Sequence, residues 1–398
     1  MKRIHVGQFN DSFPPSIDGV AQTVKNYAHH LHNKHCDITV VTPRYPDVVD
    51  NYPYEVYRYQ SLPTEKMLRY RMGNPFGPKP ILQLRKKKFD LIHIHAPFAS
   101  SVMAATVDPR HRIPIVMTYH TKFEYDMQKQ IHNRAFYKVA MDFMLYNINR
   151  ADEIWAVTDG CGKALQNIGY KGDYYVMENG TDFPFGRSDE QAVAALRERY
   201  GIDDDTFVFL FVGRMMWYKN TRIILDAMRY LKQHGLPFRT FMIGSGVDLP
   251  DIQAYAAMAG VADEVIFTGP IYDREELRVY YSMTDLFVFP STYDTSGLVV
   301  KEAAACSCAS LMVRDSCASE GARHNENAFL AEENGEDIGR VILDACQSRD
   351  KLRAVGMQAG KDLYLSWEDA VERAYKRYGE ILKQWPGPLP YNGHKNRR

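Results

Sequence analysis

The fold is decided by the stretch Phe289-Pro290-Ser291-Thr292-Tyr293-Asp294-Thr295-Ser296-Gly297-Leu298-Val299-Val300-Lys301-Glu302-Ala303-Ala304-Ala305-Cys306. The apolar run at 286–289 is typical of a buried strand, and the small residues after Gly297 are typical of a helix. In an open parallel sheet, a loop between such a strand and helix lies at the carboxyl edge, where ligands bind. The first helical turn also offers backbone N–H groups to an anion. The stretch therefore predicts an α/β fold with an anion site at Gly297 and Leu298.

Two carboxylates flank this amino end. Asp294 lies in the loop, and Glu302 follows with seven residues between them. Because Gly297 marks the change from loop to helix, both side chains can face one pocket. Carboxylates accept hydrogen bonds well, so the pattern predicts a diphosphate at the Gly297 and Leu298 amides with hydroxyl-rich groups on either side. An ordinary α/β loop with a capping Ser296 and a solvated Asp294 would account for the same residues.

The two acids, the Gly-Leu pair and Glu-Ala-Ala-Ala-Cys resemble the E-x7-E signature of retaining glycosyltransferases of the GT-B fold, family 4. The chain differs at the first position, where the family usually has Glu and this sequence has Asp294. The resemblance implies two doubly wound Rossmann-like α/β domains with a cleft between them. It also implies transfer of a hexose from a nucleotide diphosphate sugar, with a UDP-sugar favoured, and retention at the anomeric carbon. Glu302 would hold the ribose and Asp294 the sugar hydroxyls.

Length and composition agree with a two-domain globular protein. A chain of 398 residues is long for one core. Its 45% apolar content contains no run long enough to span a bilayer. The net charge of zero argues against nucleic-acid binding. We expect no cleaved signal peptide. The six cysteines show no paired spacing, which favours a cytoplasmic location. There we expect peripheral attachment to the inner face of the membrane.

A second loop carries cations. The strand expected at 207–212 is followed by Gly213-Arg214-Met215-Met216-Trp217-Tyr218-Lys219-Asn220. The forked guanidinium of Arg214 and the compact ammonium of Lys219 can neutralise a diphosphate together. They match an Arg and a Lys of the family, so the resemblance implies that they stabilise the leaving group. Gly244 and Gly269 end two further strands and fit nucleotide contacts through backbone.

The first domain supplies two more candidates. Gly19 follows Asp18 where the family usually has a Gly-Gly pair against the sugar and phosphates, although a simple turn glycine explains it too. His120 follows the strand expected at 115–118, and a histidine there contacts the donor sugar in family members. His93, His95 and His120 could form a zinc site, but the family commonly has His there without metal. We expect no metal and no cofactor, since the cationic side chains and the backbone amides would neutralise the diphosphate.

The segment 66–88 suggests membrane contact. It holds basic residues and no acid, namely Lys66, Arg69, Arg71, Lys79, Arg85, Lys86, Lys87 and Lys88. Cations mixed with apolar side chains suit an anionic membrane, at about 1 kcal/mol per basic residue, although a solvated helix end is the alternative. Tyr119-His120-Thr121-Lys122-Phe123-Glu124-Tyr125 looks like bacterial glycosyltransferases that glycosylate diacylglycerol. The predicted acceptor is therefore a membrane lipid such as diacylglycerol.

The expected domains are 1–182 and 183–365. The resemblance implies a helix at 366–385 that crosses back to the first domain, followed by a loose tail at 386–398. Within the first domain we expect one long helix at about 128–150. Two other functions stay open: a transferase acting on a polysaccharide or soluble acceptor, and a non-catalytic protein that binds sugar nucleotides.

Overall fold

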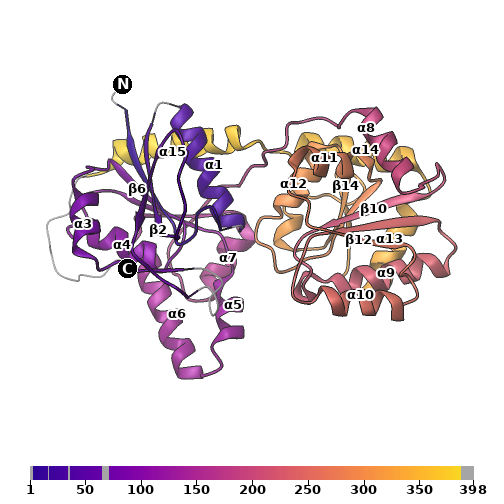
Figure 1. Cartoon of the computed structure of the whole chain (residues 1–398), viewed down its shortest axis with the longest axis horizontal. Helices are drawn as coiled ribbons and strands as arrows, with labels where there is room; N and C mark the ends of the chain where they lie inside the picture. The colour runs from indigo at the N-terminus through magenta and orange to yellow at the C-terminus, as the bar shows by residue number, and fades with distance from the viewer. Residues whose placement is uncertain (1–2, 17, 35, 65–70, 387–398) are drawn as a thin grey trace. The chain divides into compact units, whose positions relative to one another are not determined.

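The computed structural model describes residues 3–16, 18–34, 36–64 and 71–386, in two compact units (Figure 1). As far as its residues are described, unit 1 comprises Met1–Asn179 and Trp367–Arg398, and unit 2 comprises Gly180–Ser366. The sequence-based borders at 182 and 366 lie within a few residues of these. Each unit has its own parallel sheet, with helices on either side. The expected pair of Rossmann-like α/β domains is confirmed.

Unit 1 has a seven-stranded parallel sheet in the order β3-β2-β1-β6-β7-β8-β9. The strands are β3 (Glu55–Tyr59), β2 (Asp37–Pro43), β1 (His5–Phe9), β6 (Leu91–Ile94), β7 (Ile115–Tyr119), β8 (Glu153–Ala156) and β9 (Tyr175–Val176). A small antiparallel pair joins β4 (Ser61–Leu62) to β5 (Met72–Gly73). The central strands are apolar and buried because helices cover both faces. The strand order reverses between β1 and β6, which marks the ligand-binding edge of such a sheet.

The described helices of unit 1 begin with α1, whose N-cap Asp18 accepts a hydrogen bond from the Ala21 amide. They are α1 (Gly19–Asn33), α3 (Pro78–Arg85), α4 (Ala99–Val107), α5 (Phe123–Gln130), α6 (Arg134–Ile148), α7 (Asp159–Asn167) and α15 (Trp367–Gln384). The single helix expected at 128–150 is wrong. The Asn133 side chain accepts hydrogen bonds from the Ala135 and Phe136 amides and starts a new helix, α6.

The last helix, α15, belongs to unit 1 and lies beside α1 (Figure 1). Its buried face includes Trp367 and Tyr378, as the helical spacing predicts. The Tyr378 hydroxyl lies 2.6 Å from His93 Nδ1, and its ring stacks on Trp155 at 5.3 Å. Arg377 adds an ion pair with Glu153. These aromatic residues therefore form part of the core of unit 1.

Unit 2 has a six-stranded parallel sheet in the order β12-β11-β10-β13-β14-β15. The strands are β12 (Val265–Gly269), β11 (Phe238–Ile243), β10 (Phe207–Val212), β13 (Leu286–Phe289), β14 (Ala309–Val313) and β15 (Phe329–Ala331). The helices are α8 (Glu190–Arg199), η1 (Trp217–Lys219), α9 (Thr221–Gln233), α10 (Leu249–Met258), α11 (Arg274–Met283), α12 (Leu298–Ala305), η2 (Cys317–Ser319), α13 (Gly335–Ala345) and α14 (Arg349–Asp362).

The pairing of β10 with β13 positions the site of unit 2. Phe209 lies opposite Leu286, and Leu210 opposite Phe287. The strand order reverses between these two neighbours, because β11 and β12 extend to one side and β14 and β15 to the other. The two loops that the sequence singled out therefore leave the same sheet edge side by side.

In the described part of the chain, no helix combines the length and apolar character that crossing a bilayer requires.

Two helical glycines give a matched test of the packing. A Cβ at Gly356 in α14 would lie 2.2 Å from the Ser307 carbonyl oxygen, whereas nothing lies within 4 Å of a Cβ at Gly379 in α15. Gly356→Ala should lower the free energy of unfolding by about 1–3 kcal/mol. Gly379→Ala should raise it by about 0.5–1 kcal/mol, because Ala favours the helix. Urea unfolding checks both, and equal effects would contradict the close approach of α14 to the Ser307 backbone.

Candidate active site

The loop after β10 carries the predicted cations. Arg214 is exposed, whereas Lys219, in the 3-10 turn η1, has a side chain only 8% exposed. Asn220 then adopts a left-handed backbone and precedes α9. Its side-chain amide donates to the Pro290 carbonyl at 2.8 Å. This hydrogen bond joins the loop after β10 to the loop after β13.

An ion pair connects the same two loops. Lys219 Nζ lies 2.5 Å from Asp294 Oδ1. The other carboxylate oxygen, Oδ2, is buried, and no hydrogen bond reaches it from the described residues. The Tyr218 and Tyr293 rings pack 4.7 Å apart, and each ring centroid lies within 6 Å of the Lys219 ammonium. Any anion that binds Lys219 must therefore compete with Asp294 for its charge.

Helix α12 begins at this loop with an open amino end. Gly297, its N-cap, has φ 54° and ψ 47°, a left-handed conformation that suits glycine. Gly297 has no side chain to cap the helix, and the buried Ser296 hydroxyl has no hydrogen-bond partner among the described residues, so Ser296 does not play the capping role of the ordinary-loop alternative. By helix geometry, the amides of Leu298 and Val299 have no intrahelical acceptor. The anion site at Gly297 and Leu298 stays a prediction.

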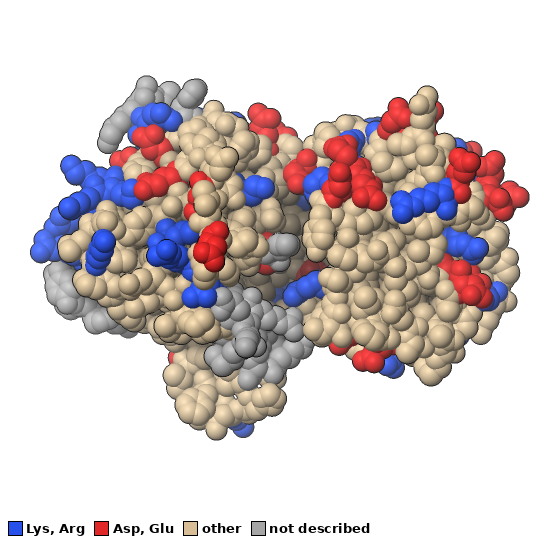
Figure 2. Space-filling view, viewed as in Figure 1, with Lys and Arg blue, Asp and Glu red and all other residues tan. Residues whose placement is uncertain are grey.

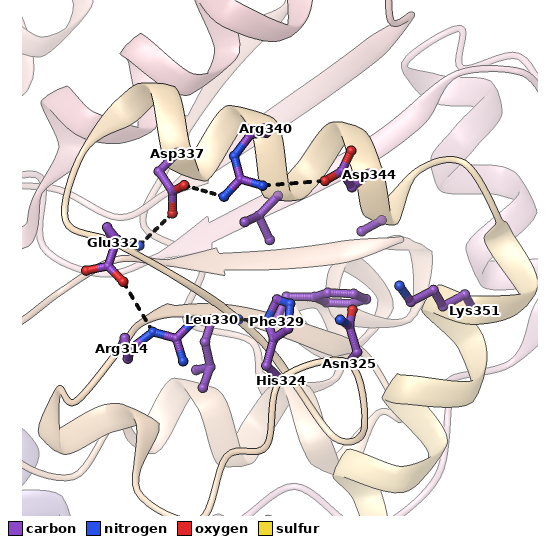
Figure 3. A pocket seen from close by; sticks show the side chains of 12 residues that line it. Arg314, His324, Asn325, Phe329, Leu330, Glu332, Asp337, Arg340, Asp344 and Lys351 are labelled. Carbon is purple, nitrogen blue, oxygen red and sulfur yellow. Dashed lines mark hydrogen bonds and ion pairs between the residues drawn. The ribbon is translucent and has the colours of Figure 1, made fainter.

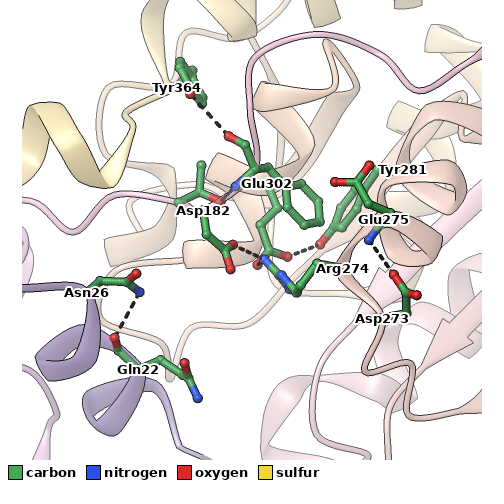
Figure 4. Close-up of polar contacts among 11 residues, drawn as sticks. Gln22, Asn26, Asp182, Asp273, Arg274, Glu275, Tyr281, Glu302 and Tyr364 are labelled. Carbon is green, nitrogen blue, oxygen red and sulfur yellow. Dashed lines mark hydrogen bonds and ion pairs between the residues drawn. The ribbon is translucent and has the colours of Figure 1, made fainter. Parts of the chain in front are cut away.

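The second acid, Glu302, is itself buried and lies in a cluster of charges with the partly exposed Arg274 and the exposed Asp182 (Figure 4). Its Oε1 is 2.7 Å from an Arg274 guanidinium nitrogen, and its Oε2 accepts from the Tyr281 hydroxyl at 3.0 Å. The same Arg274 nitrogen also pairs with Asp182, and the guanidinium lies 4.3 Å from the centre of the Phe183 ring. Each oxygen of Glu302 thus has one donor, which leaves further lone pairs for hydroxyl groups.

In this cluster, burial and the neighbouring charges shift the pKa values in opposite directions. Burial raises the pKa of Glu302, and the Arg274 guanidinium acts in the opposite direction. For Arg274, burial alone would lower the pKa, but the charges of Glu302 and Asp182 raise it. Burial also raises the pKa of Tyr281, so its hydroxyl keeps the proton that it donates to Glu302.

Sequence reasoning missed Arg274, Tyr281 and Asp182. One signal was available, because Arg274 is the first residue of α11 and follows the N-cap Asp273. The helix dipole disfavours a cation there. An arginine at that position indicates a tertiary carboxylate partner, although the sequence does not say which one.

The predicted glycines Gly244 and Gly269 meet at the same sheet edge, where the Gly244 amide donates to the Gly269 carbonyl at 3.0 Å. A Cβ at Gly244 would lie 1.9 Å from the Gly213 carbonyl oxygen, so close backbone packing already requires glycine there. Gly269 has φ 76° and open space around its Cβ position. Their nucleotide contacts stay a prediction.

In unit 1, Gly19 is the first residue of α1, with nothing within 4 Å of its Cβ position. His120 follows β7 and is buried. Its Nε2 lies 2.9 Å from His95 Nδ1, and His95 Nε2 lies 2.5 Å from Gln8 Oε1. Since the Gln8 oxygen accepts, His95 Nε2 carries the proton. A neutral His95 then accepts from His120 Nε2–H.

The same chain of polar groups continues to α15. Gln8 Nε2 donates to the Tyr378 hydroxyl at 3.5 Å, and Tyr378 contacts His93, whose Nε2 lies 2.7 Å from Thr118 Oγ1. Burial lowers the pKa of His120 to about 3, and it lowers the pKa of His93 and of His95 well below the usual value. His120 is therefore a neutral imidazole at physiological pH.

The described ranges contain no group of three or more His, Cys, Asp or Glu arranged to hold a metal ion. The nitrogens that a zinc site would need from His93 and His95 bond to protein groups instead.

Of the predicted membrane residues, Lys66 and Arg69 lie outside the described residues. Three others make contacts within unit 1: Arg71 donates to Ser61, Arg85 to the carbonyls of Thr106 and Val107, and Lys87 pairs with Glu55. Lys79, Lys86 and Lys88 are exposed. Figure 2 shows Lys and Arg gathered over the part of unit 1 where α3 lies in Figure 1. The membrane role of this segment stays a prediction.

A cavity of about 250 Å³ lies beside the edge strand β15 (Figure 3). Two of its cations are paired with acids of the same wall: Arg340 with Asp337, and Arg314 with Glu332. Its wall includes none of the predicted donor-site residues.

Comparisons with known proteins decide the family. Residues 193–362 match the family model "Glycosyl transferases group 1", and residues 17–183 match "Glycosyltransferase Family 4". The two matches span most of both units. The chain belongs to the GT-B glycosyltransferases.

Similar curated proteins and solved structures agree. The glycosyltransferase is 24% identical to alpha-monoglucosyldiacylglycerol synthase from Acholeplasma laidlawii over 351 residues, 85% of this chain and 87% of that protein. It is also 24% identical to the Streptococcus pneumoniae synthase of the same name, over 76% of this chain and 69% of the relative. Anabaena HepE in complex with UDP and glucose shares the fold, with TM-score 0.74, 16% identity, and 95% and 100% of the two chains covered. Sucrose-phosphate synthase from Thermosynechococcus elongatus has TM-score 0.77, 18% identity, and 96% and 100% coverage.

Removing Arg274 from this glycosyltransferase should leave the buried Glu302 carboxylate uncompensated. We expect Arg274→Ala to lower the free energy of unfolding by about 3 kcal/mol, the lower end for a buried pair, because the Arg274 side chain is 41% exposed. Adding Glu302→Gln should recover part of this loss, since a neutral amide needs no counter-charge. Urea unfolding measures both. Arg340→Ala, which breaks an exposed pair with Asp337, is the control and should change little. A loss that Glu302→Gln does not reduce would contradict the account.

The buried histidines of unit 1 should make the stability of the glycosyltransferase depend on pH. Between the usual pKa of 6.5 and the folded value of about 3, His120 binds a proton only in the unfolded chain. Stability should therefore fall as pH falls below 6.5, by about 1.4 kcal/mol per pH unit for each such histidine. His120→Gln should reduce this slope by about one histidine's share. Val49→Gln, an exposed change without a titratable group, is the control and should leave the slope unchanged. Urea unfolding between about pH 6 and about pH 4 measures the slope.

Proposed function

We propose that this glycosyltransferase transfers a hexose from a UDP-sugar, such as UDP-glucose, to a membrane lipid such as diacylglycerol, with retention at the anomeric carbon. The observation that carries the proposal is the Lys219–Asp294 ion pair beside the open amino end of α12, where the strand order reverses. This arrangement places a cation, free amides and a carboxylate next to one another. Those are the groups that recognise a sugar diphosphate.

The diphosphate would bind next to the cations Lys219 and Arg214. Lys219 is buried beside two tyrosine rings, so its charge interacts strongly with any anion that reaches it. The Leu298 and Val299 amides and the positive end of the α12 dipole favour the same anion. Arg214, exposed on the neighbouring loop, can add a bidentate contact. These groups would stabilise the negative charge that develops on the leaving diphosphate.

The carboxylates would hold the sugars. When a phosphate takes over Lys219, Asp294 becomes available to accept from the hydroxyls of the hexose. Glu302, fixed by Arg274 and Tyr281, would accept from the ribose hydroxyls. Backbone at Gly244 and Gly269 would meet the nucleotide. From unit 1, Gly19 and the neutral His120 would contact the donor.

We propose no metal and no cofactor for this reaction, since Lys219, Arg214 and the amides supply the positive charge. By the family resemblance, the leaving phosphate would take the proton of the acceptor hydroxyl on the same face of the sugar. The enzyme would work in the cytoplasm, on the inner face of the membrane.

The lipid acceptor is supported by the printed names of the two curated relatives, alpha-monoglucosyldiacylglycerol synthases. The UDP-sugar donor is supported by HepE, which was solved with UDP and glucose. A non-catalytic sugar-nucleotide-binding protein is the second candidate. The Lys219–Asp294 ion pair favours this second candidate. Asp294 has a shorter side chain than the Glu that is usual in the family. If it stays paired with Lys219, it would not hold the sugar hydroxyls of the donor. A polysaccharide or soluble acceptor is a further alternative within the same reaction.

The donor site can be tested with Lys219→Met. We expect kcat/KM for transfer from UDP-glucose to diacylglycerol to fall by about 10²–10³, because one stabilising donor to the leaving group is lost. Product analysis with lipid extract measures the rate. Lys232→Met, which removes a lysine at the far end of α9, is the matched control and should keep full activity.

Thermal shift with a panel of UDP- and GDP-sugars separates the alternatives. Stabilisation by a UDP-sugar with no transfer to any acceptor would favour the binding protein. Transfer to soluble acceptors but not to diacylglycerol would overturn the lipid acceptor while keeping the reaction.

A further inference from the structure

Glu333 lies in the loop after the edge strand β15, next to a second acid, Glu332. Two adjacent exposed acids in a loop would ordinarily face solvent. Glu333 instead contacts the two loops of the candidate site. Its Oε1 accepts from the Asn220 side-chain amide at 2.7 Å and from the Thr292 hydroxyl at 2.9 Å. A third loop of unit 2 therefore reaches the loops that follow β10 and β13.

Asn220 is the centre of these contacts. Although it is the N-cap residue of α9, its side chain makes no capping hydrogen bond with the described residues. Its amide nitrogen donates to the Pro290 carbonyl at 2.8 Å and also to Glu333. Since both partners are acceptors, they use both hydrogens of the amide and fix its orientation. We call the hydrogen bonds among Asn220, Pro290, Thr292 and Glu333 the three-loop network.

The loop after β15 holds Glu333 in a fixed place. The Glu332 amide donates to Asp337 Oδ2 at 2.8 Å (Figure 3), and the Asn334 amide donates to the Glu332 carbonyl at 2.8 Å. The Asn334 side chain caps α13 by accepting from the Asp337 amide. Both neighbours of Glu333 are therefore held through their backbone amides. The Glu332 side chain is not needed for this, since it pairs with Arg314.

The three-loop network lies next to both members of the Lys219–Asp294 ion pair. Asn220 directly follows Lys219, and Thr292 lies two positions before Asp294. If a diphosphate displaces Asp294 from Lys219, the ion pair no longer joins the two loops, whereas the hydrogen bonds of the network still do. They would keep the cation and the carboxylate in place while negative charge develops on the leaving diphosphate.

We propose that Glu333 is a positioning residue, which holds the loops of Lys219 and Asp294 together during sugar transfer. Glu333 acts as a hydrogen-bond acceptor, because its two partners are a neutral amide and a neutral hydroxyl. The inference rests on the proposed function for the reaction that Glu333 serves, but the effect of Glu333 on the two loops can be measured without any substrate.

Glu333→Ala removes the acceptor from both donors. We expect kcat for transfer from UDP-glucose to diacylglycerol to fall about tenfold, with KM for UDP-glucose changed less than about threefold, because positioning matters most in the transition state. Glu333→Gln keeps an accepting oxygen at the same distance along the side chain and should restore at least about half of the unaltered kcat. Glu332→Ala, on the adjacent acid, is the matched control and should keep the unaltered kcat.

Stability tells positioning from folding. Since both hydrogen bonds of Glu333 are exposed, Glu333→Ala should leave the midpoint of urea unfolding almost unchanged. A fall in kcat that only matches a fall in the folded fraction would overturn the proposal. So would a Glu333→Gln variant as slow as Glu333→Ala, because the charge of Glu333 and not its hydrogen bonds would then be responsible.

A double variant ties the effect to Asn220. Asn220→Gly keeps the left-handed backbone but removes the side-chain amide. Combined with Glu333→Ala, it should lower kcat by less than the product of the two single effects, because both changes break the same hydrogen bond. Single effects that simply multiply would contradict the three-loop network.

Hydrogen exchange followed by mass spectrometry tests the network without a sugar nucleotide. In Glu333→Ala the peptides that cover 216–221 and 289–296 should exchange at least about threefold faster, and in Glu333→Gln and Glu332→Ala at the unaltered rate. Unchanged exchange in Glu333→Ala overturns the proposal even where the enzyme is active. If the unaltered protein transfers no sugar from any donor of the panel, the proposed function fails, and the exchange rates still decide whether Glu333 holds the two loops.

Discussion

The parallel pairing of β10 with β13 is the constraint on which the site of unit 2 depends. Neighbouring parallel strands end at the same sheet edge, so the loop with Lys219 and the loop with Asp294 have to meet. Their ion pair and the Asn220 hydrogen bond to Pro290 fix the two loops to each other. The same strand order directs the amino end of α12 towards this edge. A cation, a carboxylate and free amides therefore converge without any of them being adjacent in sequence.

Two sets of paired charges lie at the candidate site of unit 2. Glu302 is compensated by Arg274, and Arg274 also neutralises part of Asp182. Lys219 is compensated by Asp294. Because a lone buried charge is costly, each set holds its side chains in fixed positions. A ligand that replaces Asp294 at Lys219 has to supply a negative charge in its place.

Unit 1 differs from unit 2 in that it buries the histidines His93, His95 and His120. Its polar chain runs from His120 through His95 and Gln8 to Tyr378 of α15, so the last helix of the chain helps set the orientation of a residue after β7. Since these imidazoles are buried and neutral, hydrogen bonds rather than charge attraction hold them.

The sequence by itself determined the elements and the edge where they meet. Apolar runs predicted the strands at 207–212 and 286–289 as the structure has them, and Gly297 marked the start of α12. These features depend on neighbouring residues, so local patterns reveal them. The break at Asn133 was also local and could have been predicted from its capping side chain. Only the tertiary structure paired Lys219 with Asp294, 75 positions away, and Glu302 with Arg274, 28 positions away. Such pairs follow from strand order and side-chain packing, which no single stretch of sequence contains.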